Sequence, residues 1–324
     1  MVKRILVPLD GSALAARAIP VAARLARASA GSMLFLRVVS TASEFGVYMD
    51  ESSPLMQEAI EEDLHAANTY LAEVSQSQAL AGIKVDTGIF TGSAALKIVD
   101  IARSQDIDLI VMCSRGDAGI KRWVMGSVAH KVVRHSPVPV LVLRDSGEQS
   151  AHLYQEQERP LRVLVTLDGS PLAETALEPV VQLVRQLAIS GRCHLNLLRV
   201  IDLPNRYGGW RSLSAIDNKV LEQARETADD YMQLVAERVR ADVPDTATVT
   251  TSIRIEMDVP AAIIDAAEHG DEKEVGGYDL VAMATHGRGT IPRWALGSVT
   301  ERVLDSTCLP LLVVGPQELH SYGI

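Results

Sequence analysis

The stretch RILVPLDGSALAARAI, residues 4–19, recurs as RVLVTLDGSPLAETAL, residues 162–177. Each copy has a short apolar run, an Asp-Gly-Ser turn and a second run rich in Ala and Leu. The first run is typical of a buried strand, and the serine after the turn is a favoured N-cap of a helix. The stretch therefore predicts a strand, a turn and a helix, and the chain holds this unit twice.

Further segments match between the two copies in the same order. They are LFLRVVS from residue 34 with LNLLRVID from residue 195, DLIVMCSRG from 108 with DLVAMATHG from 279, and SPVPVLVLR from 136 with TCLPLLVVG from 307. The period is far longer than that of a solenoid repeat, so each copy is predicted to be a domain. We expect domains over residues 1–145 and 161–324, joined by a polar linker over residues 146–160.

Strand-like and helix-like segments alternate within each copy. In the first copy, strands are expected at residues 4–9, 32–39, 83–90, 109–114 and 138–143, and helices after residue 12 and at 54–77, 93–105 and 127–135. Pro20 lies inside the first of these helices and should kink it. This alternation predicts the α/β class, with two Rossmann-like domains that each have a five-stranded parallel sheet and helices on both faces.

Composition limits the classes of partner. The 324 residues carry a formal net charge of −10, which argues against a protein that coats nucleic acid. The three cysteines have no metal-site spacing and indicate a reducing compartment. The first apolar run is too short for a signal peptide, and no segment approaches the roughly 20 apolar residues that span a bilayer. We therefore expect a cytoplasmic protein without nucleic-acid or membrane partners.

Ligands of open parallel sheets bind beyond the carboxyl ends of the strands, so the residues just after each strand are the candidates for a site. Asp10 and Asp168 follow the first strands, and their carboxylates suit ribose hydroxyls or the adenine amino edge. Small residues follow the fourth strands, and an anion there would meet backbone N–H groups and the positive end of the next helix. In these segments the serines of Gly126-Ser127 and Gly297-Ser298 are expected to act as N-caps and hydroxyl donors.

The common nucleotide and hydrolase signatures are absent. The sequence has no GxxxxGK[ST], no GxSxG and no HExxH, and GRGTIP fails GxGxxG at its last glycine. A glycine followed ten residues later by Gly-Ser is a weak signal by itself. It becomes a strong one because it occurs twice, after equivalent strands, with an aspartate after each first strand.

These motifs resemble a tandem universal stress protein over both halves, from ILVPLDGS to PVLVLR and from VLVTLDGS to PLLVVG. Nucleotide-binding members of that family, whose fold is called adenine nucleotide alpha hydrolase-like, carry Gly-x2-Gly-x9-Gly-Ser/Thr. The second half has Ala284, Gly287, Gly297 and Ser298 at these positions, and the first half has Cys113, Gly116, Gly126 and Ser127. The opening glycine is thus replaced in both halves.

The resemblance implies a regulator of the stress response that binds ATP, with ADP or AMP as alternatives and Mg²⁺ as a companion of ATP. It implies a nucleotide site in the second half at Asp168, Val200, Met283, Ala284, His286, Gly287, Arg288, Gly297, Ser298 and Val299. It implies a corresponding site in the first half at Asp10, Val38, Met112, Arg115, Gly116, Gly126, Ser127 and Val128. It also implies that the last strands of the two domains pair as an intramolecular pseudo-dimer, with a further homodimer as an extension.

Simpler interpretations stay open for each residue. Asp10 and Asp168 could be turn residues, Gly-Ser an ordinary helix start, and Arg288 a solvated charge. His286 has no positioned partner for a catalytic role, and no catalytic residue is assigned. Two other functions also stay open: a non-binding dimeric scaffold, and an ATP hydrolase, which would be slow without a metal-binding carboxylate pair.

The two halves are expected to differ in affinity. After the second glycine of the motif, the second half has Arg288 and the first half has Asp117. Two unit charges 4 Å apart interact by about 4 kcal/mol at an effective dielectric near 20, and exposure and salt reduce this to about 1 kcal/mol. Cys113 adds bulk where the second half has Ala284. We therefore predict that the second half binds ATP more tightly.

Overall fold

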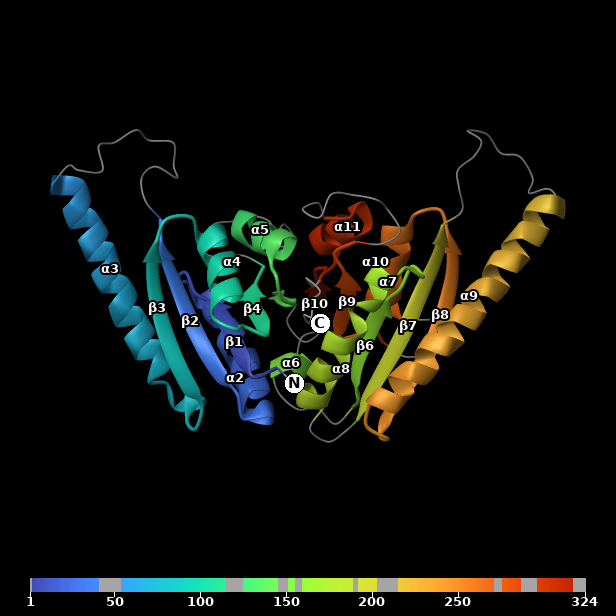
Figure 1. The fold of residues 1–324 in the computed structure, drawn as a ribbon, viewed down its shortest axis with the longest axis horizontal. Coiled ribbons are helices and arrows are strands. Elements are labelled where there is room, and N and C mark those ends of the chain that lie inside the picture. Colours follow the sequence, from blue (N-terminus) through green and yellow to red (C-terminus); the bar gives the residue numbers. More distant parts are fainter. Residues whose placement is uncertain are drawn as a thin grey trace, which may run out of the picture. The chain divides into compact units, whose positions relative to one another are not determined.

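The structure, a computed structural model, describes residues 2–40, 54–114, 125–144, 151–154, 159–188, 192–202, 215–270, 276–286 and 296–316. The chain divides into two compact units, and the boundary falls between Arg144 and Asp145. The two units correspond to the two sequence copies and are called the first half and the second half below. Most of their elements are labelled in Figure 1.

The first half holds five strands in a parallel sheet. Its elements are β1 (Arg4–Pro8), α1 (Ala13–Ala16), α2 (Ala18–Ser29), β2 (Ser32–Val39), α3 (Pro54–Ser75), the 3₁₀ helix η2 (Gln78–Leu80), β3 (Lys84–Thr91), α4 (Ala94–Ser104), β4 (Leu109–Cys113), α5 (Ser127–His135) and β5 (Val140–Leu143). The strand order is β3-β2-β1-β4-β5, and the order turns at β1, the first strand of the chain.

The second half repeats this arrangement. Its elements are β6 (Leu161–Thr166), α7 (Pro171–Glu174), α8 (Leu177–Leu187), β7 (Cys193–Asp202), α9 (Ala215–Asp242), β8 (Ala247–Glu256), α10 (Val259–His269), β9 (Leu280–Ala284), α11 (Ser298–Ser306) and β10 (Leu311–Val314). The order β8-β7-β6-β9-β10 is again parallel throughout. The predicted fold class, with five parallel strands in each half, is confirmed.

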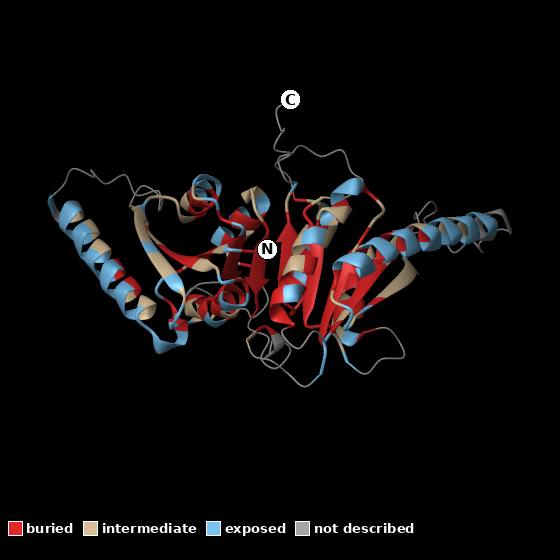
Figure 2. Cartoon of the chain, turned by 60° about the horizontal axis from the view of Figure 1, so that its bottom comes forward, coloured by how far each residue is buried: buried red, intermediate tan, exposed pale blue. Residues whose placement is uncertain are grey.

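The core is formed by strands that are covered on both faces. Met33 to Leu36 of β2 are all buried, and so are all five residues of β9. Because successive side chains of a strand point to opposite faces, such runs require cover on both sides of the sheet. Figure 2 shows the buried strands beneath helices whose outer sides are exposed.

The first helix of each half is divided near a proline. The sequence predicted a kink at Pro20, and the break lies at Arg17, between α1 and α2. Pro20 has no N–H to donate to the carbonyl of Ala16, four residues earlier, so the helix is interrupted there. Pro179 is the third residue of α8, as Pro20 is of α2, and α7 ends before it at Glu174.

Among its described residues, the segment predicted to be a linker contains a short helix that sequence reasoning did not anticipate. This helix, α6, covers Ala151–Tyr154, and the side chain of Leu153 is fully buried. The apolar residue therefore anchors part of a segment whose composition is otherwise polar.

Candidate functional site

An Asp-Gly turn follows the first strand of each half. Gly11 has φ = 87° and Gly169 has φ = 84°, a left-handed conformation that favours glycine. One carboxylate oxygen of Asp10 accepts the backbone N–H of Ser12 at 2.9 Å, and Asp168 accepts that of Ser170 at 2.9 Å. Both aspartates therefore stabilise their turns, and the turns hold them at the carboxyl ends of β1 and β6.

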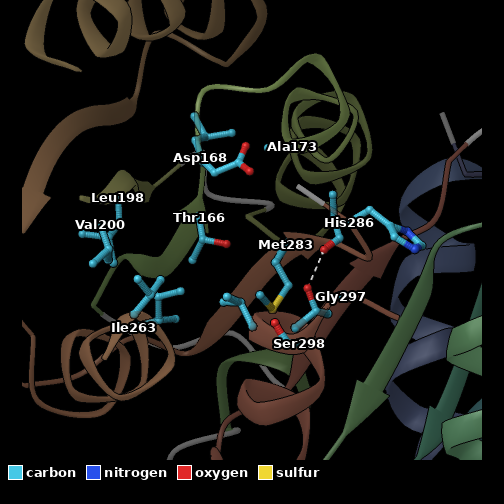
Figure 3. A pocket seen from close by; sticks show the side chains of 15 residues that line it. Thr166, Asp168, Ala173, Leu198, Val200, Ile263, Met283, His286, Gly297 and Ser298 are labelled. Carbon is cyan, nitrogen blue, oxygen red and sulfur yellow. Dashed lines mark hydrogen bonds between the residues drawn. The ribbon is translucent and has the colours of Figure 1, made fainter. Parts of the chain in front are cut away.

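A cavity of about 230 Å³ opens at the carboxyl ends of β6, β7 and β9 in the second half. Figure 3 shows it from close by, with Asp168 on one side and Gly297 and Ser298 on another. Its lining consists of Thr166, Leu167, Asp168, Ala173, Leu198, Val200, Val259, Ile263, Met283, Ala284, His286, Gly297, Ser298, Val299 and Thr300.

The cavity has an apolar part and a polar part. Leu198 and Val200 of β7 and Ile263 of α10 supply branched apolar side chains, and Met283 of β9 adds a thioether. The carboxylate of Asp168 and the start of α11 supply the polar groups. A few placed polar groups on a mostly apolar wall are typical of sites for small organic ligands.

The helices after the fourth strands begin with an uncapped turn. Gly126 and Gly297 are the N-caps of α5 and α11, with no side-chain cap hydrogen bond among the described residues. The prediction that Ser127 and Ser298 act as N-caps was therefore wrong, because each serine is the first helical residue. The N–H groups of these first turns have no intrahelical acceptor, which is the arrangement that attracts anions.

Backbone contacts fix both helix starts against the preceding strand. Gly297 donates its N–H to the carbonyl of Thr285 at 2.8 Å, and Gly126 donates to that of Ser114 at 2.7 Å. A Cβ atom on Gly297 would lie 3.0 Å from the Thr285 carbonyl oxygen. The close approach of the two segments thus favours glycine at this position.

A buried side chain ties α11 to β9 in the second half. The hydroxyl of Thr300 donates to the carbonyl of Ala284 at 2.9 Å, and Thr300 is 4% exposed. The first half has Ala129 at the corresponding position, which lacks a hydroxyl. Only the second half can therefore make this bond at its helix start.

His286 lies at the edge of the cavity as a neutral side chain. Burial lowers the pKa of its imidazole, and Nδ1 lies 3.0 Å from the hydroxyl of Thr285. In Figure 3 the ring is turned away from the other labelled side chains. His286 thus brings little positive charge to the cavity near neutral pH, and its ring does not approach Asp168 or Ser298 as a base would.

A charged cluster lies beside the cavity, between α7 and α9. Tyr231 donates its hydroxyl to Glu174 at 3.1 Å, and Arg238 pairs with the other carboxylate oxygen at 2.6 Å. The guanidinium of Arg199 lies over the Tyr231 ring, 5.3 Å from its centroid. Burial and the neighbouring Glu174 raise the pKa of Tyr231, so the phenol stays protonated and keeps α7 attached to α9.

Most of the residues expected in the second-half site line the cavity. They are Asp168, Val200, Met283, Ala284, His286, Gly297, Ser298 and Val299. In the first half, Asp10 follows β1, Val38 belongs to β2, Met112 belongs to β4, and Gly126, Ser127 and Val128 form the start of α5. The other expected residues, Arg115, Gly116, Gly287 and Arg288, lie outside the described residues.

Sequence reasoning missed part of the apolar wall. Leu198 is two residues before Val200 on the same face of β7, so the period of a strand could have indicated it. Val259 and Ile263 are four residues apart on one face of α10. That spacing marks an apolar face but does not say which cavity it covers. Thr166, Leu167, Ala173 and Thr300 also line the cavity without having been predicted.

The described residues contain neither a metal-binding cluster nor a membrane-spanning helix. No group of three or more His, Cys, Asp and Glu side chains that could hold a metal ion is found in the described segments. No helix among these residues is long and apolar enough to cross a membrane.

Comparison with known proteins identifies the family. The sequence profile of the universal stress protein family matches residues 1–144 and again residues 161–315. A universal stress protein of Mycolicibacterium smegmatis is 26% identical over 317 residues, covering 97% of both chains. A single-domain-sized relative from Methanocaldococcus jannaschii is 31% identical over 142 residues, 44% of this chain and 82% of its own.

Comparison with solved structures agrees on the fold. The crystal structure of a universal stress protein from Archaeoglobus fulgidus superposes with a TM-score of 0.66, at 20% identity, over 97% of this chain and 98% of that one. The chain therefore belongs to the universal stress protein family, with two family domains in tandem.

Proposed function

We propose that the second half binds an adenine nucleotide, preferably ATP, in the cavity at the carboxyl ends of β6, β7 and β9, and that the protein acts as a regulator of the stress response. One observation carries this proposal: a single cavity joins an apolar wall, a carboxylate and an uncapped helix start. These three features suit the three parts of a nucleotide, which are base, ribose and phosphate.

The lining suggests how the nucleotide lies. The adenine ring packs against Leu198, Val200, Ile263 and Met283, and Asp168 accepts hydrogen bonds from the ribose hydroxyls. The phosphates then approach the N–H groups of Ser298 and Val299 at the start of α11. A volume of about 230 Å³ is below the roughly 300–1,000 Å³ of a typical ligand pocket, so it suits the nucleoside part with the phosphates extending outward.

The phosphate end determines the choice among ATP, ADP and AMP. On the basis of the resemblance to universal stress proteins, we propose that Arg288 contacts the outer phosphates. We also propose that Mg²⁺ accompanies ATP on its phosphate oxygens. The first half is proposed as the weaker site, through Asp10, Val38, Met112, Gly126, Ser127 and Val128. A cytoplasmic location stays a prediction from composition.

Mass spectrometry of nucleotide released from the purified, denatured protein tests the binding proposal. We expect about one equivalent of adenine nucleotide per chain, or more if the weaker first-half site is also occupied. A protein that carries none, and takes up none when ATP is added, would instead act as a scaffold. Phosphate release over many turnovers would identify the chain as a hydrolase and contradict a purely regulatory role.

The two domains are also proposed to form a pseudo-dimer within the chain through their last strands. β5 and β10 each end the strand order of their own half, and a short apolar edge strand is normally paired or covered. Hydrogen exchange tests this, because paired strands protect their amides and open edges exchange quickly. Light scattering tests the further homodimer.

A further inference from the structure

Two side chains of the first half lie together beside the first Asp-Gly turn. Arg37 comes from β2 and Tyr70 from α3, and the guanidinium carbon lies 5.9 Å from the centroid of the Tyr70 ring. A Cβ atom on Gly11 would lie 2.5 Å from Nη1 of Arg37. The guanidinium therefore packs directly onto the turn that carries Asp10, and a side chain at Gly11 would displace it.

The polar atoms of this pair lack acceptors. Nε and Nη1 of Arg37 and the hydroxyl of Tyr70 are buried and have no hydrogen-bond partner in the described part of the chain. A buried donor without an acceptor is costly, about 1–3 kcal/mol and more for a charged group. Three such donors within one cluster indicate that an acceptor belongs there.

The second half shows what kind of acceptor fits. There the equivalent pair is Arg199 and Tyr231, and the Tyr231 hydroxyl donates to the carboxylate of Glu174 at 3.1 Å. Glu174 is the last residue of α7, and the last residue of α1 is Ala16. The first half thus keeps the arginine and the tyrosine but lacks the carboxylate that its repeat supplies.

We propose that the first half binds a small anion, a carboxylate or a phosphate, at Arg37 and Tyr70, in the position that the second half fills with the side chain of Glu174. This site goes beyond the proposed nucleotide site, because its donors are side chains of β2 and α3 rather than the N–H groups at the start of α5.

The chemistry of the two donors suits such an anion. A guanidinium offers paired N–H groups in a plane, which match the oxygens of carboxylate and phosphate. Burial raises the pKa of Tyr70, with Asp10 adding to the rise and Arg37 opposing it, so the phenol keeps its proton and remains a donor. Asp10 also repels a second anion, so we expect Asp10→Asn to strengthen binding.

Calorimetric titration of the full chain with inorganic phosphate, and separately with succinate, tests the proposal without any nucleotide. The wild-type chain is compared with Ala16→Glu, which places the carboxylate of the second half into the first. Ala13→Glu is the matched control, because it adds the same charge at the exposed first residue of α1. We expect Ala16→Glu to bind one anion fewer per chain, and Ala13→Glu to bind as the wild type does.

Three more variants test the donors and the repeat. Arg37→Gln should lower the affinity for this anion about tenfold or more, and Tyr70→Phe should lower it several-fold. Glu174→Ala should add one anion per chain, because it creates the same vacancy in the second half. Whichever of the two ligands binds identifies the anion as a phosphate or a carboxylate.

The same numbers of bound anions in the wild type and Ala16→Glu would overturn the proposal. So would unchanged affinity in a folded Tyr70→Phe variant, which conserves the shape of the side chain. Binding of ATP is measured independently, so failure of the anion site and failure of the nucleotide site are distinguishable.

Discussion

The two halves of the chain share a strand order but differ in the residues around their carboxyl ends. The second half has Ala284 at the end of β9, Thr300 in the first turn of α11 and Glu174 at the end of α7. The first half has Cys113, Ala129 and Ala16 at the corresponding places. The apolar pattern of the strands, which sets the fold, is therefore shared by the two copies, while the side chains around the candidate site differ between them.

Charge differs at the helix starts as well. Glu301 lies in the first turn of α11, where α5 has His130. A carboxylate near a helix N-terminus occupies the same field that an anion would use, so Glu301 works against phosphate binding in the second half. The expected advantage of the second half thus depends on Arg288, on the smaller Ala284 and on the apolar cavity outweighing this carboxylate.

The largest expected effect is at Asp168. Asp168→Ala should lower the affinity for ATP by roughly tenfold or more, since a hydrogen bond to a charged group contributes about 1.5–3 kcal/mol. Calorimetry measures this. Asp168→Asn keeps an oxygen that can accept the Ser170 N–H but removes the charge. It therefore distinguishes loss of the turn from loss of the contact with the ligand. Asp10→Ala, the matched change in the first half, should have a smaller effect on total binding.

The second-largest effect is expected from removing the buried hydroxyl of Thr300. Thr300→Ala gives the second half the residue of the first and leaves the Ala284 carbonyl without its donor. We expect a loss of about 1–2 kcal/mol in the free energy of unfolding. Denaturant unfolding measures it, with Thr300→Ser as a control that keeps the hydroxyl. An unchanged midpoint for Thr300→Ala would mean that the bond does not hold α11 to β9.

A swap at the ends of the fourth strands tests the steric part of the comparison. Ala284→Cys should reduce ATP affinity in the second half by a few-fold, because one extra atom in a filled site costs about 1 kcal/mol. Cys113→Ala should improve binding in the first half by a similar factor. If each variant binds as the wild type does, bulk at this position is not a cause of the asymmetry.

The smallest effect concerns pH. Burial lowers the pKa of His286 in the folded chain from its ordinary value of 6.5, so the unfolded chain binds the proton more readily. Stability is therefore fully present above pH 6.5 and decreases as pH falls through 6.5 towards the folded pKa. Unfolding curves between pH 8 and 5 should show this slope. His286→Gln should flatten it, and a steeper slope in that variant would contradict the assignment.

Much of the fold could be predicted because local patterns decide it. The expected strands of the first half begin and end within two residues of β1 to β5, and the cap of α1 by Ser12 is present, with the Ala15 N–H 3.0 Å from its hydroxyl. The N-caps of α5 and α11 were predicted one residue too late. At both sites a glycine whose own N–H bonds the preceding strand takes the cap position instead.

The site was harder to predict than the fold. Asp168 and Gly297 follow from the rule that parallel sheets bind ligands at their carboxyl ends. Val259 and Ile263 could not be assigned, because the cover of the cavity depends on how α10 packs across β7. The link from Glu174 to Tyr231 joins residues 57 positions apart, and nothing in the repeated segments pairs Glu174 with a tyrosine.

Titration of ATP into Gly126→Trp and into Gly297→Trp tests the central claim most directly. Each variant fills one helix start with an indole and leaves the other half unchanged. Since a Cβ atom on Gly297 would lie close to the Thr285 carbonyl, the melting temperature of each variant is measured alongside. We predict that Gly126→Trp, which keeps the second half, retains several-fold tighter binding than Gly297→Trp. Equal affinities in two folded variants, or tighter binding by Gly297→Trp, would contradict the account.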